Sequence, residues 1–181
     1  MIRTWMLVAL LLSACSQDNT ESAQSWSGLH ANEVVQISLQ KMASKKIELV
    51  LQKGEWMLSD GTKAQQDAVY RLLDDLEGMQ WVRVVTQKRS HDAELGLEHA
   101  VHVLCQGASG KHLLDLEVGK QGSDLLSTYV RRVGEDEVIA VNRSLVWQVH
   151  RRLSSWRDKA PKVAGEKVMP SATPNVSEGG L

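Results

Sequence analysis

The chain has 181 residues, with 21 basic and 22 acidic side chains and a formal net charge of −1. This balance argues against nucleic-acid binding, because proteins that bind nucleic acids need a basic field to neutralise phosphates. Hydrophobic residues make up 43% of the sequence and charged residues 24%, which is typical of a globular protein and excludes a chain disordered throughout. The length fits one ordinary domain with additional ends.

The first fifteen residues have the layout of a bacterial export signal. Arg3 precedes an apolar run from Trp5 to Leu12, and its eight residues rise only about 12 Å as a helix, too little to span a bilayer. We therefore interpret residues 1–14 as a signal peptide. The run ends in Leu-Ser-Ala-Cys, which resembles the lipobox of bacterial lipoproteins. The resemblance implies that Cys15 is acylated, with palmitate among its chains, and becomes the mature N-terminus; the alternative is an ordinary signal with an incidental cysteine.

An acylated Cys15 would attach the protein stably to a membrane, because two or more acyl chains bury enough CH₂ groups for permanent anchoring. Ser16 stands where an aspartate would resemble an inner-membrane retention signal, so it favours the outer membrane, with the protein facing the periplasm. Residues 15–32 are polar and predict a flexible tether with a root-mean-square span of about 20–25 Å. At the other end, residues 161–181 contain the three prolines of the chain and predict a disordered tail.

Alternating apolar residues predict strands over 35–39, 47–51 and 54–58. The period then changes to that of a helix over residues 63–79, and a further strand is expected over 81–85. The apolar face of this helix is formed by Ala68, Val69, Leu72, Leu73, Leu76 and Met79.

The second half repeats a similar order of strands followed by a helix. Strands are expected over 101–105, 114–118, 128–132 and 138–141, and a final helix over 144–159 that ends before Pro161. The buried stripe of this final helix is formed by Leu145, Val146, Val149, Leu153 and Trp156. Residues 33–160 are therefore predicted to form an α+β domain, an antiparallel sheet with two packed helices and a βββα structural duplication.

The run from Glu33 to Lys159 resembles a bacterial domain-of-unknown-function family, number 4340. The resemblance is carried by Gly54-Glu55-Trp56-Met57-Leu58, Lys63-Ala64-Gln65-Gln66-Asp67-Ala68-Val69, Leu72-Leu73, Leu95-Gly96-Leu97, Val118-Gly119-Lys120, Tyr129-Val130-Arg131 and Trp156-Arg157-Asp158-Lys159. Glu98 and His99 stand where the family often has proline, a change confined to a loop. The resemblance implies a membrane-anchored envelope protein, often encoded near gliding-type ABC transporter components, and it supplies no catalytic residues.

Cys105 is the only cysteine besides Cys15. A turn over 107–110 would place Cys105 opposite His112, a pairing that could act as nucleophile and base. Cys105 shares its strand face with apolar residues, however, and burial raises a thiol pKa and makes the thiol inert. The same register would place His102 opposite Asp115 as a polar cross-strand pair. We expect no metal ion and no cofactor.

The tryptophans divide into two groups. Trp56, Trp81 and Trp156 occupy positions of buried patterns and are expected in the core. Trp147 and His150 lie off the buried stripe of the final helix, beside Arg151. An exposed aromatic residue next to arginine is typical of interaction hot spots, so these three residues predict a partner surface. The alternative is that Trp147 folds over the edge of the sheet.

These features favour a non-enzymatic cell-envelope lipoprotein that serves as an accessory or interaction module of a membrane-associated assembly. Its expected partners are the membrane, through the lipid on Cys15, and an envelope protein, with an ABC transporter component as one candidate. Two alternatives stay open. One is a small periplasmic ligand-binding protein, which would need a large apolar pocket. The other is a hydrolase that uses Cys105 and a nearby histidine.

Overall fold

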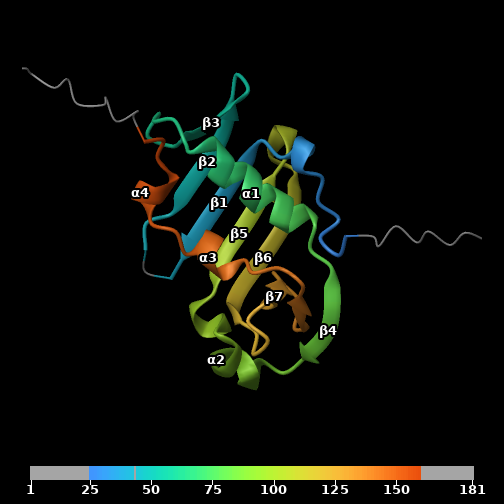
Figure 1. Cartoon of the computed structure of the whole chain (residues 1–181). Helices are drawn as coiled ribbons and strands as arrows, with labels where there is room; N and C mark the ends of the chain where they lie inside the picture. The colour runs from blue at the N-terminus through green and yellow to red at the C-terminus, as the bar shows by residue number, and fades with distance from the viewer. Residues whose placement is uncertain (1–24, 43, 160–181) are drawn as a thin grey trace, which may run out of the picture.

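The computed structural model describes residues 25–42 and 44–159. The predicted signal peptide (1–14), the lipidation site Cys15 and the predicted tail (161–181) lie outside these residues. The described part forms one eight-stranded antiparallel sheet with the order β3-β2-β1-β5-β6-β7-β8-β4 (Figure 1). The strands are β1 (Gln36–Lys41), β2 (Ile47–Gln52), β3 (Glu55–Leu58), β4 (Trp81–Thr86), β5 (Val101–Gln106), β6 (His112–Gln121), β7 (Thr128–Arg132) and β8 (Val138–Val141).

The strands form where the sequence alternates, and the alternation decides which side chains are buried. In β5, Val101, Val103 and Cys105 point into the core, and the residues between them are half-buried on the other face. Two meanders, β1–β3 and β5–β8, join through the pairing of β1 with β5. All the strands predicted from the sequence are therefore present, within a few residues of their predicted ends.

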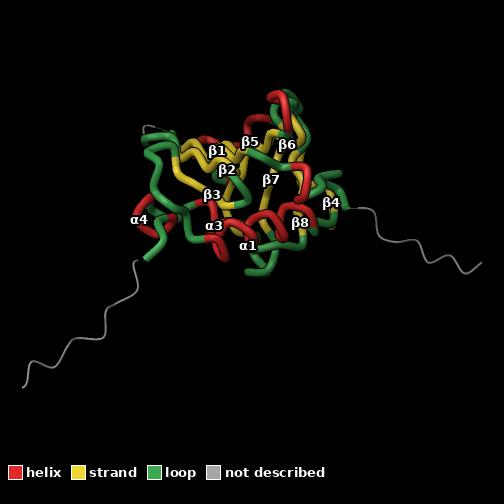
Figure 2. Tube along the Cα trace, turned by 90° about the horizontal axis from the view of Figure 1, so that it is seen from above, coloured by secondary structure: helices red, strands yellow, loops and turns green. Residues whose placement is uncertain are grey.

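Helix α1 (Gln66–Glu77) covers one face of the sheet and confirms the helix predicted within 63–79. It lies on the same side of the sheet as the short helix α3 (Val146–Val149), which Figure 2 shows from above. The buried side chains of α1 are Ala68, Val69, Leu72, Leu73 and Leu76. They pack with the inward residues of β1, β5 and β6 into the main core.

The predicted α+β architecture with two packed helices is wrong. The structure is mostly a sheet with few short helices, and so lies closer to an all-β fold. The final helix predicted over 144–159 is instead two four-residue helices, α3 and α4 (Leu153–Trp156). The βββα duplication is not seen either, because four strands, β5–β8, follow one another in the second half without a second long helix.

The break in the final helix has a structural cause. Arg152 adopts an extended backbone, with φ −74° and ψ 153°, between α3 and α4. This turn lets the carbonyl of Trp156 accept a hydrogen bond from the N–H of Gln65 at 2.8 Å, and lets Arg157 pair with Ala64. Residues 144–159 therefore gain more from packing against the segment before α1 than from forming one continuous helix. An isolated helix of this length is only marginally stable in water.

A smaller core lies on the other face of the sheet, beneath α2 (Asp92–Leu95). It consists of Leu95, Leu97, Tyr129, Val138 and Ala140. Two of the family motifs meet here, because a Cβ on Gly119 would lie 2.5 Å from the carbonyl oxygen of Leu95. Gly96, between Leu95 and Leu97, has a φ of 73° that favours glycine, and it packs against Lys120. The glycines of both motifs therefore permit the close approach of α2 to β6.

The tryptophan predictions are confirmed in two positions and wrong in one. Trp56 and Trp156 are buried in the main core. Trp81 is 53% exposed, because it lies on β4 at the edge of the sheet, where fewer neighbours cover a side chain. A local pattern predicts a strand, but it does not reveal whether that strand is central or at an edge.

The folded part begins earlier than the predicted boundary at residue 33. Leu29 is buried, and the N–H of Trp26 donates to the carbonyl of Met79 at 2.9 Å. The guanidinium of Arg132 lies 4.5 Å from the centre of the Trp26 ring. Residues 25–32 therefore pack on the domain, which corrects the later part of the predicted tether. Within the described residues, no helix has the length and apolar character needed to cross a membrane.

Candidate functional site

The segment from α3 to α4 carries or borders the three residues predicted to form a partner surface, Trp147, His150 and Arg151. Leu145 and Val149 anchor α3 in the core, and the N–H of Leu145 is held by the hydroxyl of Thr128 at 3.0 Å. With this side fixed, Trp147 points outward and is 75% exposed. It does not fold over the sheet edge, so the alternative placement of Trp147 does not hold.

His150 and Arg151 follow α3 and differ in their surroundings. The backbone carbonyl of His150 accepts a hydrogen bond from the Lys41 Nζ at 2.8 Å. Burial, together with the charge of Lys41, lowers the pKa of His150 below its ordinary value. The guanidinium of Arg151 lies 5.5 Å from the centre of the Trp156 ring, a cation–π contact that holds it half-buried.

A pocket of about 230 Å³ opens between this segment and the turn from β1 to β2. Its apolar lining is Leu39, Ile47, Val149 and Leu153. Its polar lining is basic and consists of Lys41, Lys45, Lys46, Arg151 and Arg152, with Ser44. One of these charges, on Lys46, is paired with Glu48 at 2.7 Å. The pocket therefore combines an apolar floor with a strongly basic rim.

The sequence predicts a functional role for Arg151, on one side of this pocket, but not for the lysines on the other side. Arg151 was expected at an interaction surface because it neighbours an exposed aromatic residue. Lys41, Lys45 and Lys46 are about one hundred residues away in the chain, and only the fold brings them beside Arg151 and Arg152. Their basic run at the β1–β2 connection was a signal, but nothing in the sequence indicates which segment they face.

This arrangement suits an anionic group better than a neutral apolar ligand. Five cationic side chains line the opening, and within the described residues only Lys46 among them is paired with a carboxylate, so a negative charge held beside the other four gains favourable electrostatic energy. The volume is below the roughly 300–1,000 Å³ that small-molecule sites usually occupy.

Cys105 lies in the core and is not paired with His112. The observed register places Cys105 opposite Leu114, two residues from the partner that was predicted. Burial, with a smaller contribution from Asp115, raises the pKa of the Cys105 thiol to about 12. His112 is exposed, so the two side chains do not form the nucleophile and base of a hydrolase.

His102 forms a polar pair with Asp115. His102 lies opposite Glu117 in the register, and its Nε2 nevertheless hydrogen-bonds the carboxylate of Asp115 diagonally across the two strands. The predicted contact is therefore present, although the predicted register is wrong. Across the residues described by the structure, no three His, Cys, Asp or Glu side chains are grouped as metal ligands would be.

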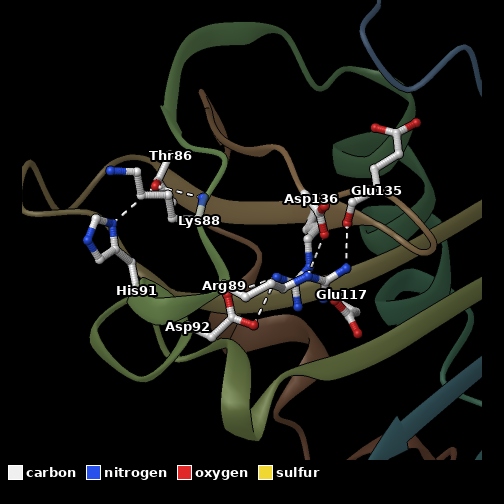
Figure 3. A network of polar contacts seen from close by, with 9 residues as sticks. Thr86, Lys88, Arg89, His91, Asp92, Glu117, Glu135 and Asp136 are labelled. Carbon is white, nitrogen blue, oxygen red and sulfur yellow. Dashed lines mark hydrogen bonds and ion pairs between the residues drawn. The ribbon is translucent and has the colours of Figure 1, made fainter.

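A buried ion network on the second face of the sheet was not anticipated from the sequence. The Arg131 side chain is 3% exposed, and it donates to both oxygens of Asp92, at 2.8 and 2.9 Å, and to Glu117 at 2.7 Å. Figure 3 shows Asp92 and Glu117 beside the neighbouring exposed pair of Arg89 and Asp136. Burial opposes the charged form of Arg131, but these hydrogen bonds outweigh it and raise its pKa. The network fastens α2 to β6 and β7.

The comparisons with known proteins identify one family. The sequence model of the domain of unknown function DUF4340 matches residues 56–171, which is more than half of the chain. This match begins at β3 and so starts later than the resemblance noted from Glu33. The comparison with curated proteins and the comparison with solved structures each found no match. The chain belongs to the DUF4340 family of domains of unknown function.

Proposed function

We propose that the protein is a non-enzymatic lipoprotein of the cell envelope that serves as an interaction module of a membrane-associated assembly. The sequence supports the anchor, through the lipobox-like residues before Cys15. The family resemblance supports a setting beside envelope machinery, with an ABC transporter component as the candidate partner. The outer membrane, facing the periplasm, is the proposed location.

One observation carries the interaction role: Trp147 is held outward on α3 and is followed directly by the basic pocket. Exposed tryptophan and arginine are the residues that most often dominate binding at protein interfaces. Holding a large apolar ring in water is unfavourable, and here the buried anchors Leu145 and Val149 maintain that position. We infer that Trp147 packs on the partner while an acidic side chain of that partner enters the pocket.

The two alternatives find less support in the geometry. A periplasmic ligand-binding role would favour a larger enclosed apolar pocket than the one beside Arg151. A hydrolase role would need a reactive thiol, whereas Cys105 is buried with a raised pKa. The basic pocket and Trp147 are explained more simply by contact with an acidic protein surface.

The test is crosslinking of the full chain in native envelopes, with Trp147→Ala as the first variant. We expect the crosslinks to a specific envelope protein to weaken while the melting temperature stays near that of the wild type. Tyr70→Ala is the matched control, because Tyr70 is a 52% exposed aromatic residue on α1, outside the segment from α3 to α4. Unchanged crosslinks in the Trp147 variant would contradict the assignment.

A charge variant separates the pocket from the tryptophan. Lys45→Glu and Arg152→Glu together replace two exposed cations at the rim. We expect this double variant to weaken the same crosslinks and to make the contact that remains less sensitive to salt, because charge attraction at a surface is screened by ions. The variant Cys15→Ala tests the anchor independently, and we expect it to lose its attachment to the membrane. Absence of acyl mass on Cys15 of the wild type would contradict the anchor.

A further inference from the structure

The two edge strands of the sheet, β3 and β4, differ in whether other segments bond to their outer backbone groups. On the outer side of β4, no described strand does so. In the part of the chain that the structure describes, β4 pairs only with β8, and its outer side meets no other strand (Figure 1). Trp81, Val82 and Val84 are 53%, 47% and 42% exposed. An edge of this kind presents unpaired N–H and C=O groups, together with apolar side chains, to the surroundings.

Few of the devices that normally protect an edge are present on β4. The strand has no proline, and Arg83 is its only charged residue. Two register shifts, one between Trp81 and Arg83 and one between Val84 and Thr86, interrupt its pairing with β8. Such bulges twist an edge and give partial protection, but they leave the middle of β4 uncovered.

The unpaired backbone groups of β4 indicate what kind of segment can bind this edge. Unpaired backbone groups along an extended strand are satisfied best by a second extended strand. We propose that β4 pairs antiparallel with β4 of a second copy of this chain, so that the two sheets become continuous. The interface is isologous, because the same strand supplies both sides, and this is the commonest symmetry of soluble oligomers.

The sequence of β4 allows self-pairing, and its charge selects between the two registers that pair five residues of the strand. Two identical antiparallel strands in one sheet are related by a two-fold axis perpendicular to the sheet, so one residue faces its own copy. An axis at Arg83 would place two like charges opposite each other, which is destabilising. An axis at Val84 instead places Val84 opposite itself, Arg83 opposite Val85, and Val82 opposite Thr86. All these residues lie within β4, and no like charges meet.

The test uses the full chain, purified in detergent and oxidised gently. We expect Val84→Cys to form a disulfide-linked dimer, because each introduced thiol would face its copy across the axis. Met42→Cys is the matched control, since Met42 is 68% exposed on a turn in another part of the fold. The oxidised wild type reports any dimer that forms through Cys15 or Cys105.

Sedimentation of the same proteins supplies the second measurement. We expect the wild type to shift from monomer to dimer as its concentration rises, and Val84→Lys to stay monomeric with an unchanged melting temperature. The proposal is overturned if Val84→Cys yields no more dimer than Met42→Cys, or if the wild type sediments as a monomer at every concentration. It is equally overturned if, in membranes, Val84→Cys crosslinks to a different protein and never to itself.

Discussion

The β3 edge and the β4 edge of the sheet show two ways in which a chain can end a ladder of strands. At β3, the N–H of Trp56 is bonded to the Gln66 side chain at 2.9 Å, and the N–H of Leu58 is bonded to the carbonyl of Thr62 at 2.8 Å. The segment before α1 thus closes this edge with its backbone, and Gln66, the first residue of α1, adds its amide side chain. At β4 no described segment does the same.

The difference shows that edge protection in this fold depends on distant parts of the chain. The closing segment at β3 is itself held by Trp156, whose carbonyl bonds to the N–H of Gln65. The segment from α3 to α4 therefore has two roles, since Trp156 holds the residues that close the β3 edge and Trp147 lies on the surface. The β4 edge lies on the other side of the molecule and is available for a second copy of the chain.

The largest expected effect concerns the support of the closed edge. Trp156→Ala should lower the free energy of unfolding by about 3–5 kcal/mol, because a fully buried aromatic side chain leaves a large cavity. Denaturant unfolding measures this loss. Trp147→Ala is the control, and its change should stay within about 0.5 kcal/mol because Trp147 is exposed. Equal losses in the two variants would show that the C-terminal segment packs differently.

Much of the fold was predictable from local patterns, and the failures have a common cause. The alternation in β5 and the helical period of α1 predict elements that are present. The period of 144–159 also fits a helix, but pairing with residues distant in sequence breaks it at Arg152. The exposure of Trp81 and the lysine wall of the pocket likewise depend on which segments the fold brings together, which a local pattern does not contain.

The second expected effect is on the half of the sheet nearer β4. Arg131→Ala should cost about 2–3 kcal/mol, because it leaves Asp92 and Glu117 without their shared partner; their partial exposure lowers the loss below that of a fully buried pair. Arg89→Ala is the control, since Arg89 and Asp136 form an exposed pair worth at most about 1 kcal/mol. A similar loss of stability in both variants, measured by denaturant unfolding, would contradict a structural role for the buried network.

A smaller effect is expected from the amide that closes the β3 edge. Gln66→Ala should cost about 1–2 kcal/mol, because the N–H and carbonyl of Trp56 both lose a hydrogen-bond partner. Gln52→Ala is the control, because it makes the same substitution at an exposed position. Thermal unfolding and self-association should be measured together, since opening this edge would also create a new site for strand pairing. A variant as stable as the wild type would show that the edge does not need Gln66.

The smallest expected effect is a change in pH dependence at the closed edge. Hydrogen bonds from the side chain and the backbone of Thr62, with a further contribution from Arg157, lower the pKa of Asp60 to about 2. Because the folded-state pKa lies below the ordinary value of 3.8, the stabilisation is present above pH 3.8 and is lost as the pH falls towards 2. An NMR titration of the Asp60 carboxyl carbon should give a midpoint near the lower value. A midpoint at the ordinary value would mean that these bonds do not persist in solution.

Amide hydrogen exchange of the full chain, followed at increasing protein concentration, tests the difference between the two edges most directly. The amides of Trp56 and Leu58 should exchange slowly at every concentration, because their partners lie within the same chain. The amides of β4 that do not pair with β8 should exchange quickly in the dilute protein and become protected as it associates. Protection of all β4 amides in the dilute monomer, or none at any concentration, would contradict an open edge that pairs with a second copy.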